Sequence, residues 1–325
     1  MKWTLDYCVP VALFAIACGV SLWLNDYFLY VVTIGAIFAV LAVSFDLLLG
    51  YTGYLSLAHG ALYGVGAYCC GILTGWHGVP FIPSMLVAGL LTGLVGAVIA
   101  LLAFRTKGLY FAVLTLGIGL IGHQLFLIAT PLTGGIGGFI GIPSPDIPSW
   151  LPVRQVVYNS FLAFALLLVA YLIVRAFVRS RFGAACLAVR EDITLAQALG
   201  IRIGWPRLAA FAISATFTGM AGALFAGLSN FIAPESFTVL GTGFELVALV
   251  VVGGLGTIWG PILGAILLTA LPEALRVAAT YSLLAYGALL LFFIIFYPRG
   301  IASILRGLWS RVAAFSGLKS GRASS

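Results

Sequence analysis

Charged residues are scarce in this chain. Asp, Glu, Lys and Arg together make up only 8% of its 325 residues, whereas a soluble globular domain has about 25%. Hydrophobic residues make up 62%, and the mean hydropathy is +1.18. A soluble fold of this length would leave too much apolar surface in water. The composition therefore excludes an ordinary soluble protein and predicts a fold whose solvent is the lipid bilayer.

Residues that build metal and nucleotide sites are equally sparse. The chain has three histidines and five cysteines, and none of them has the spacing of metal ligands. No Gly-x-x-x-x-Gly-Lys-Ser/Thr phosphate loop occurs, so we do not expect this chain to hydrolyse ATP itself. An enzyme would also need a catalytic constellation, which the sequence does not supply. We expect no metal, no cofactor and no catalytic residue.

Apolar runs that are long enough, or nearly long enough, to cross a membrane recur along the chain. A spanning helix needs about 20 residues. The run at 261–274 is shorter, and the run at 55–75 is interrupted by glycines, so the sequence leaves open whether these two cross fully. We predict an all-α polytopic membrane protein with about ten transmembrane segments, at 9–24, 28–49, 55–75, 84–104, 109–130, 156–177, 207–230, 240–258, 261–274 and 279–297.

The chain divides into three parts by composition. Residues 1–27 form an N-terminal segment with an uncleaved first helix, because no cleavage site is followed by a domain that looks secreted. Residues 28–300 form the transmembrane domain, and residues 301–325 form a basic tail.

Lys and Arg indicate the orientation. If the N-terminus is cytoplasmic and the segments alternate, only Arg154 and Arg276 fall outside, and the opposite topology would reverse that ratio. We therefore expect both termini and the charged connection 178–206 to be cytoplasmic. The connection 131–155, which is rich in Gly and Pro, should be external.

The inner connection has the pattern of a short helix. Asp192 or Thr194 can cap its N-terminus, and Gly200 can end it. Small or apolar residues lie between its charges, namely Ala196, Ala198 and Leu199. Such a helix suits docking into a groove on a partner protein. A helix that lies on lipid headgroups has the same pattern, so both interpretations stay open at this point.

A few ionisable groups lie inside apolar runs. A charge there costs at least about 2.5–3.5 kcal/mol, so such groups usually face protein or water. Glu245 is the best candidate for a solute path, and a structural hydrogen bond is the alternative. His59 is a second candidate, with the capping of broken backbone as its alternative. In a secondary transporter driven by an ion gradient, Asp46 and Glu245 would instead carry protons.

Five stretches of the sequence resemble one known family, and they occur in the family's order. The first reads LLLGYTGYLSLAHGALYGVGAY and covers 47–68. The others cover 108–117, 132–135 with 141–143, 181–201 and 251–265. Together they are similar to the permease subunits of branched-chain amino-acid ABC importers, of the LivM type. The resemblance runs from about residue 28 to residue 300.

The resemblance implies a role for each part. The chain would be a permease subunit in a bacterial inner membrane, with the ABC-importer permease fold. Its expected partners are a second related permease, separate ATPase subunits and an extracytoplasmic solute-binding protein. The solute would be a branched-chain or similar small amino acid, although permeases for urea and short amides look similar. Contact with the ATPase would involve the coupling loop, through Gly183, Arg190, Glu191, Asp192, Ala196, Ala198 and Gly200.

Overall fold

The computed structural model describes residues 2–106, 108–149 and 151–274, together with 287, 291, 295, 296, 300 and 301. Helices dominate it: α1 (Lys2–Ser21), α2 (Asp26–Thr52), α3 (His59–Gly75), α4 (Phe81–Ala103), α5 (Leu109–Ile128), α6 (Thr130–Thr133), α7 (Gln155–Arg179), α8 (Arg181–Glu191), α9 (Ile193–Ala198), α10 (Gly204–Ser229), α11 (Phe244–Gly253) and α12 (Trp259–Ala274). The shorter elements are η1 (Gly135–Gly137), β1 (Phe139–Ile140), β2 (Phe231–Ile232), η2 (Pro234–Phe237) and η3 (Val239–Gly243).

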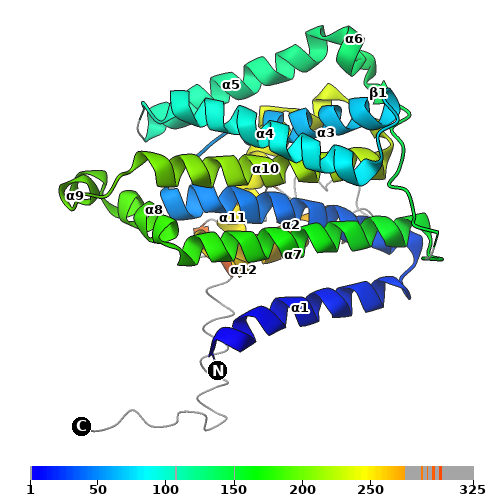
Figure 1. Cartoon of the computed structure of the whole chain (residues 1–325), viewed down its shortest axis with the longest axis horizontal. Helices are drawn as coiled ribbons and strands as arrows, with labels where there is room; N and C mark the ends of the chain where they lie inside the picture. Colours follow the sequence, from blue (N-terminus) through cyan, green and yellow to red (C-terminus); the bar gives the residue numbers. More distant parts are fainter. Residues whose placement is uncertain are drawn as a thin grey trace, which may run out of the picture.

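The long helices lie side by side along one direction, as Figure 1 shows. Within the described residues, six segments are long and apolar enough to cross a membrane, which confirms the predicted all-α polytopic fold. They are 26–52, 81–103, 109–128, 155–179, 204–229 and 234–253. Three further predicted segments correspond to shorter apolar stretches, in α1, α3 and α12. The tenth, at 279–297, falls almost wholly outside the described residues.

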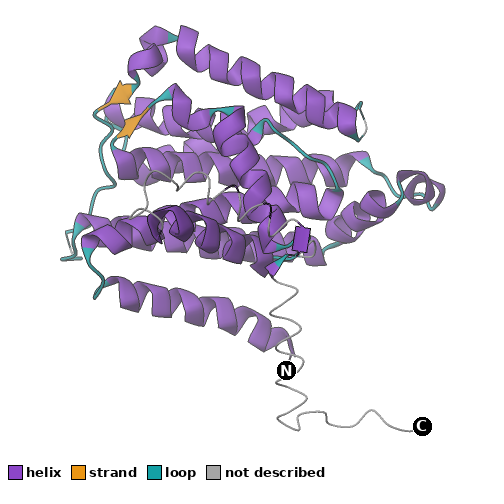
Figure 2. Ribbon diagram, turned by 180° about the vertical axis from the view of Figure 1, so that it is seen from behind, coloured by secondary structure: helices purple, strands orange, loops and turns teal. Residues whose placement is uncertain are grey.

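Two of the predicted segments are only partly helical. The chain leaves α2 at Gly53, whose φ of +75° is the left-handed conformation that glycine adopts without strain. Residues 53–58 are not helical, and α3 begins at His59. In the same way α10 ends at Ser229, with Asn230 as its cap, and the chain returns to a long helical run only at Val239, where the π-helical η3 leads directly into α11. Each half of the chain thus has a long helix, a break and a shorter helix. The strand β2 (Phe231–Ile232) in the second break belongs to the orange strand pair in Figure 2.

The two breaks meet inside the bundle. A Cβ atom on Gly60 would lie 3.1 Å from the carbonyl oxygen of Thr238, so the start of α3 touches the backbone that leads into α11. The backbone freed by the first break is satisfied by protein, because the Leu57 N–H donates to Thr115 Oγ1 at 3.2 Å. Non-helical backbone at membrane depth is stable only when it is enclosed in this way.

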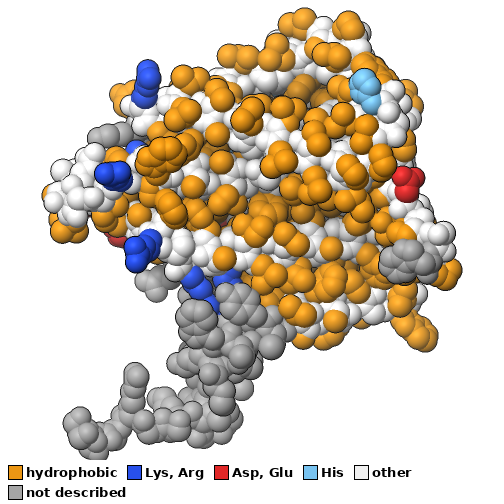
Figure 3. All heavy atoms as spheres, in the orientation of Figure 1, with side chains coloured by type: hydrophobic (Ala, Val, Ile, Leu, Met, Phe, Trp, Pro, Cys, Tyr) orange, Lys and Arg blue, Asp and Glu red, His pale blue; other side chains and the backbone are white. Residues whose placement is uncertain are grey.

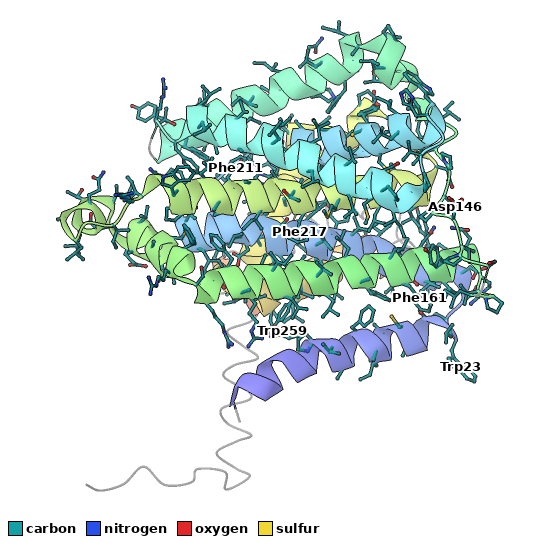
Figure 4. All side chains as sticks on the ribbon, in the orientation of Figure 1. Trp23, Asp146, Phe161, Phe211, Phe217 and Trp259 are labelled. Carbon is teal, nitrogen blue, oxygen red and sulfur yellow. The ribbon has the colours of Figure 1, made fainter. Side chains whose placement is uncertain are left out.

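Helix α10 occupies the centre and packs against α2, α3 and α4. Its contacts use glycine, which lets two backbones approach closely. A Cβ atom on Gly222 would lie 2.1 Å from the carbonyl oxygen of Tyr63, and one on Gly66 would lie 2.1 Å from that of Gly219. Figure 4 shows Phe211 and Phe217 on this helix. The many glycines are therefore partly explained by backbone contact between α3 and α10.

The two ends of the bundle differ. At one end β1 and β2 pair antiparallel, which adds a two-residue ribbon that the all-α prediction did not contain. Asn230 fastens the connection beside it by donating to the Ile142 carbonyl and to Ser144 Oγ, both at 2.8 Å. At the other end α8 and α9 project beyond the long helices (Figure 1).

Candidate coupling site and solute path

The connection 178–206 folds into two short helices with well-defined caps. Ser180 caps α8 by accepting from the Phe182 and Gly183 N–H groups. Asp192 caps α9, and its Oδ1 accepts from the Thr194 and Leu195 N–H groups at 2.7 and 3.1 Å. After α9 the chain reverses at Gly200, whose φ is +78°. The predicted Asp192 cap and Gly200 end are both present, while the helix α8 and its Ser180 cap were not predicted.

The outer face of α9 is apolar. Leu195 is 59% exposed and Leu199 is 71% exposed, and Ala198 lies exposed between them. Ala196 is only 2% exposed, so it packs into its own chain. The prediction that Ala196, Ala198 and Leu199 together form the exposed surface is therefore wrong for Ala196. The helical turn points Ala196 inward, and Leu195 is exposed instead.

The remaining predicted coupling residues divide in the same way. Glu191 and Asp192 are exposed at the junction of α8 and α9. Gly183 is buried, and a Cβ atom there would lie 2.2 Å from the carbonyl oxygen of Val178. Gly183 therefore permits the sharp corner between α7 and α8, rather than offering a surface to a partner.

Arg190 joins α8 to the transmembrane core. Its guanidinium donates to the carbonyl oxygen of Gly50, near the end of α2. Beside it, the Gly256 N–H donates to Asp46 Oδ1 at 2.9 Å, which fastens the turn after α11 to α2. Asp46 is only 1% exposed. Arg190 thus contacts the end of α2 next to the point where the α11–α12 turn binds α2. These residues are far apart in the sequence.

His59 lies at the first break and is fully buried. Its Nδ1 lies 3.0 Å from Ser56 Oγ, and its Nε2 lies 2.9 Å from Ser214 Oγ. The ring also makes an edge contact with Phe45, with centroids 5.0 Å apart. With both nitrogens occupied, His59 joins the broken segment to α10, which favours its capping role over a place in a solute path.

Glu245 lies in the first turn of α11, directly after the π-helical η3 that follows the second break. Its side chain is partly exposed and lies near enough to Tyr63 for electrostatic interaction. The Tyr63 hydroxyl is buried and has no hydrogen-bond partner among the described residues. Glu245 is therefore a carboxylate near the second break, within electrostatic range of a buried hydroxyl group that has no partner among the described residues. Tyr63 was not among the residues predicted for the path.

Two titratable groups in the 178–206 connection have shifted pKa values. The backbone N–H groups of Leu195 and Thr194 lower the pKa of Asp192, so this cap stays ionised. Burial raises the pKa of the Cys186 thiol to about 12. The thiol is therefore protonated at neutral pH and poorly reactive.

The comparisons with known proteins agree over most of the chain. Residues 27–296 match the family model described as branched-chain amino acid transport system, permease component. The chain is 32% identical over 298 residues to the high-affinity branched-chain amino acid permease protein LivM of Escherichia coli, covering 85% of this chain and 70% of that protein. It is 28% identical over 299 residues to LivH of the same organism, covering 83% and 92%.

A relative with a different named solute also matches. The chain is 27% identical over 291 residues to the autoinducer 2 import permease LsrC of Yersinia enterocolitica, covering 85% of this chain and 70% of that protein. No solved structure matches the chain.

Proposed function

The chain belongs to the family of branched-chain amino acid transport permeases, and we propose that it forms half of the membrane channel of an ATP-driven importer, with an ATPase subunit docked on α9. It is a multi-pass inner-membrane transport component, not an enzyme. The docking proposal rests on one observation above all. A capped helix projects from the bundle with Leu195, Ala198 and Leu199 exposed.

The charge distribution supports a cytoplasmic position for this end. Arg105, Arg181 and Arg202 lie at the end of the bundle that carries α8 and α9. The blue side chains in Figure 3 gather there. At the opposite end the exposed Arg154 is paired with Asp26. The positive-inside rule then supports a cytoplasmic position for α8, α9 and the N-terminus, and an external position for the β1–β2 ribbon.

The two breaks are the proposed place of the solute path. Transporter sites commonly form where helices are discontinuous, because the freed helix ends offer charge and hydrogen-bonding groups. Glu245 stands at the start of α11, where it can meet the ammonium group of an amino acid. The path would lie between this subunit and a second, related permease. By analogy with the relatives, the solute is a branched-chain or similar small amino acid.

Arg190 provides a route from the ATPase to the path. A displacement of α9 would move α8. Arg190 of α8 would transmit that displacement to the end of α2 and to the turn that is bound to Asp46. That turn follows α11, the helix that carries Glu245. The rigid elements between the proposed docking surface and the proposed path are therefore continuous.

An ion-coupled secondary transporter is the alternative. In it Asp46 and Glu245 would carry protons. The Asp46 side chain is buried, and its Oδ1 accepts from the Gly256 N–H while its Oδ2 has no partner among the described residues. A urea or short-amide permease of the same family would share the docking surface and differ only in the solute.

Substitution of Ala198 tests the docking proposal. Ala198→Glu places a charge in the middle of the exposed apolar face of α9, so the ATPase should no longer co-purify and uptake should stop. Burial of an unpaired charge at an interface is costly. Ala198→Ser keeps the small size and is the matched control, which should retain both properties.

Gly200→Val tests the same helix differently. No atom lies within 4 Å of a Cβ atom there, so its effect would come from backbone strain at φ +78° and not from a clash. It should weaken ATPase binding while the amount of folded protein stays normal.

Full co-purification of the ATPase with Ala198→Glu would show that α9 is not the docking element.

A further inference from the structure

A groove with an arginine rim lies beside α10. Helices α4, α8 and α10 form its walls, and its volume is about 680 Å³. Its floor is apolar and combines alanines, including Ala97, Ala209 and Ala212, with larger side chains such as Leu208. Arg181 and Arg202 are the charged residues of its lining, and both are exposed. The groove therefore joins a cationic rim to an apolar floor.

A second hollow lies further along α10. It has a volume of about 380 Å³ and lies between α4, α7 and α10. The first hollow ends on α10 at Ala212, and the second begins at Ile213 and reaches Met220. Figure 4 labels Phe217, one of its lining residues. From Trp205 to Met220 the helix rises about 22 Å, which exceeds the roughly 15 Å depth of one leaflet's hydrocarbon.

The charge at the rim is positive only. Among the described residues that line the two hollows there is no Asp or Glu. Arg207 lies nearby but is buried, and it donates to the Tyr54 hydroxyl at 2.5 Å and to the Ile203 carbonyl at 2.9 Å. Arg181 and Arg202 are therefore the cations presented to a ligand. Trp205 lies beside them, as tryptophan commonly does at a membrane surface.

We propose that this groove binds an anionic phospholipid. The headgroup phosphate would lie between Arg181 and Arg202, and one acyl chain would follow α10 past Ala212 towards Thr216. Basic pockets between helices at the cytoplasmic surface are suited to anionic headgroups. A soluble protein partner could reach the arginines but not the apolar floor, which extends to the depth of the hydrocarbon. Charge and depth together thus select a lipid.

Native mass spectrometry of the full chain with its partner subunits tests this inference. The complex would be taken from nanodiscs that contain phosphatidylglycerol and phosphatidylcholine in equal parts. The wild-type complex should retain phosphatidylglycerol. The double variant Arg181→Gln/Arg202→Gln should retain it roughly 25-fold less well, about fivefold for each arginine. Arg154→Gln removes the same kind of charge at the other end and should retain the lipid as the wild type does.

A steric variant tests whether the lipid's acyl chain occupies the groove, as distinct from a headgroup held by the arginine charges alone. Ala212→Phe fills the floor without changing the charge and should also lose the lipid. Leu94→Phe adds bulk on α4, where the side chain is 65% exposed, and should not. Equal retention of phosphatidylglycerol by all variants would overturn the proposal. Loss of the ATPase or of the second permease from the arginine variant, with the lipid retained, would also overturn it, since the groove would then be a protein interface.

Discussion

Replacement of Gly222 by alanine places a methyl group where α10 touches α3. The new Cβ atom would lie 2.1 Å from the Tyr63 carbonyl oxygen and 3.0 Å from the Ala67 nitrogen. That is more than an ångström closer than ordinary contact, and the obstacle is backbone, so no side chain can rotate away. The two helices must separate. Overpacking of this kind costs about 1–3 kcal/mol.

A matched control removes the effect of helix propensity. Alanine is a better helix former than glycine by about 1 kcal/mol, which would hide part of the loss. Gly117→Ala makes the same change in α5, where no atom lies within 4 Å of the new Cβ. The two variants would be compared by reversible unfolding in mixed detergent micelles. Gly222→Ala should be less stable than Gly117→Ala by about 1–3 kcal/mol, and equal stability would refute the close contact between α3 and α10.

Three further predictions concern the path and the 178–206 connection. Glu245→Gln should lower uptake while the complex still assembles, and normal uptake at normal expression would favour a structural role. Cys186 should resist maleimide in the folded protein, because its pKa is about 12, and should react after unfolding. The pKa of Asp192 is lowered, so its cap is intact above the ordinary carboxyl pKa of about 3.9 and is lost as the pH falls through the lower folded value. Amide exchange in α9 should therefore rise in acid, and a flat profile would contradict the cap.

Local signals in the sequence were sufficient for several features. The Asp192 cap and the Gly200 end of α9 depend on neighbouring residues, and both are present. The long helices follow from apolar length alone. An interruption of the segment 55–75 was predicted at its glycines, but the break lies earlier, at residues 53–58. Residues 54–58 are mostly apolar, and hydropathy does not distinguish an extended stretch from a helix.

Contacts between distant residues could not be predicted. His59 meets Ser214 and Arg190 meets Gly50 only because the fold brings their helices together. Nothing in the periodicity near either residue marks its partner. The burial of Ala196 was also missed, since a helix of six residues is too short for its pattern to show which side faces the core.

Orientation can be checked with single cysteines in intact cells. Gln197→Cys on α9 should be protected from a membrane-impermeant maleimide, and Ile140→Cys, in the ribbon at the opposite end, should react. The reverse pattern would place α9 outside and remove the basis for ATPase docking.

Reconstituted transport tests the central proposal most directly. Proteoliposomes would contain this chain, the related permease and the ATPase, with the solute-binding protein outside and ATP inside. The account predicts accumulation of a branched-chain amino acid that requires ATP and this chain, and that stops with Ala198→Glu. Accumulation that needs no ATP but follows an imposed proton or sodium gradient would contradict it.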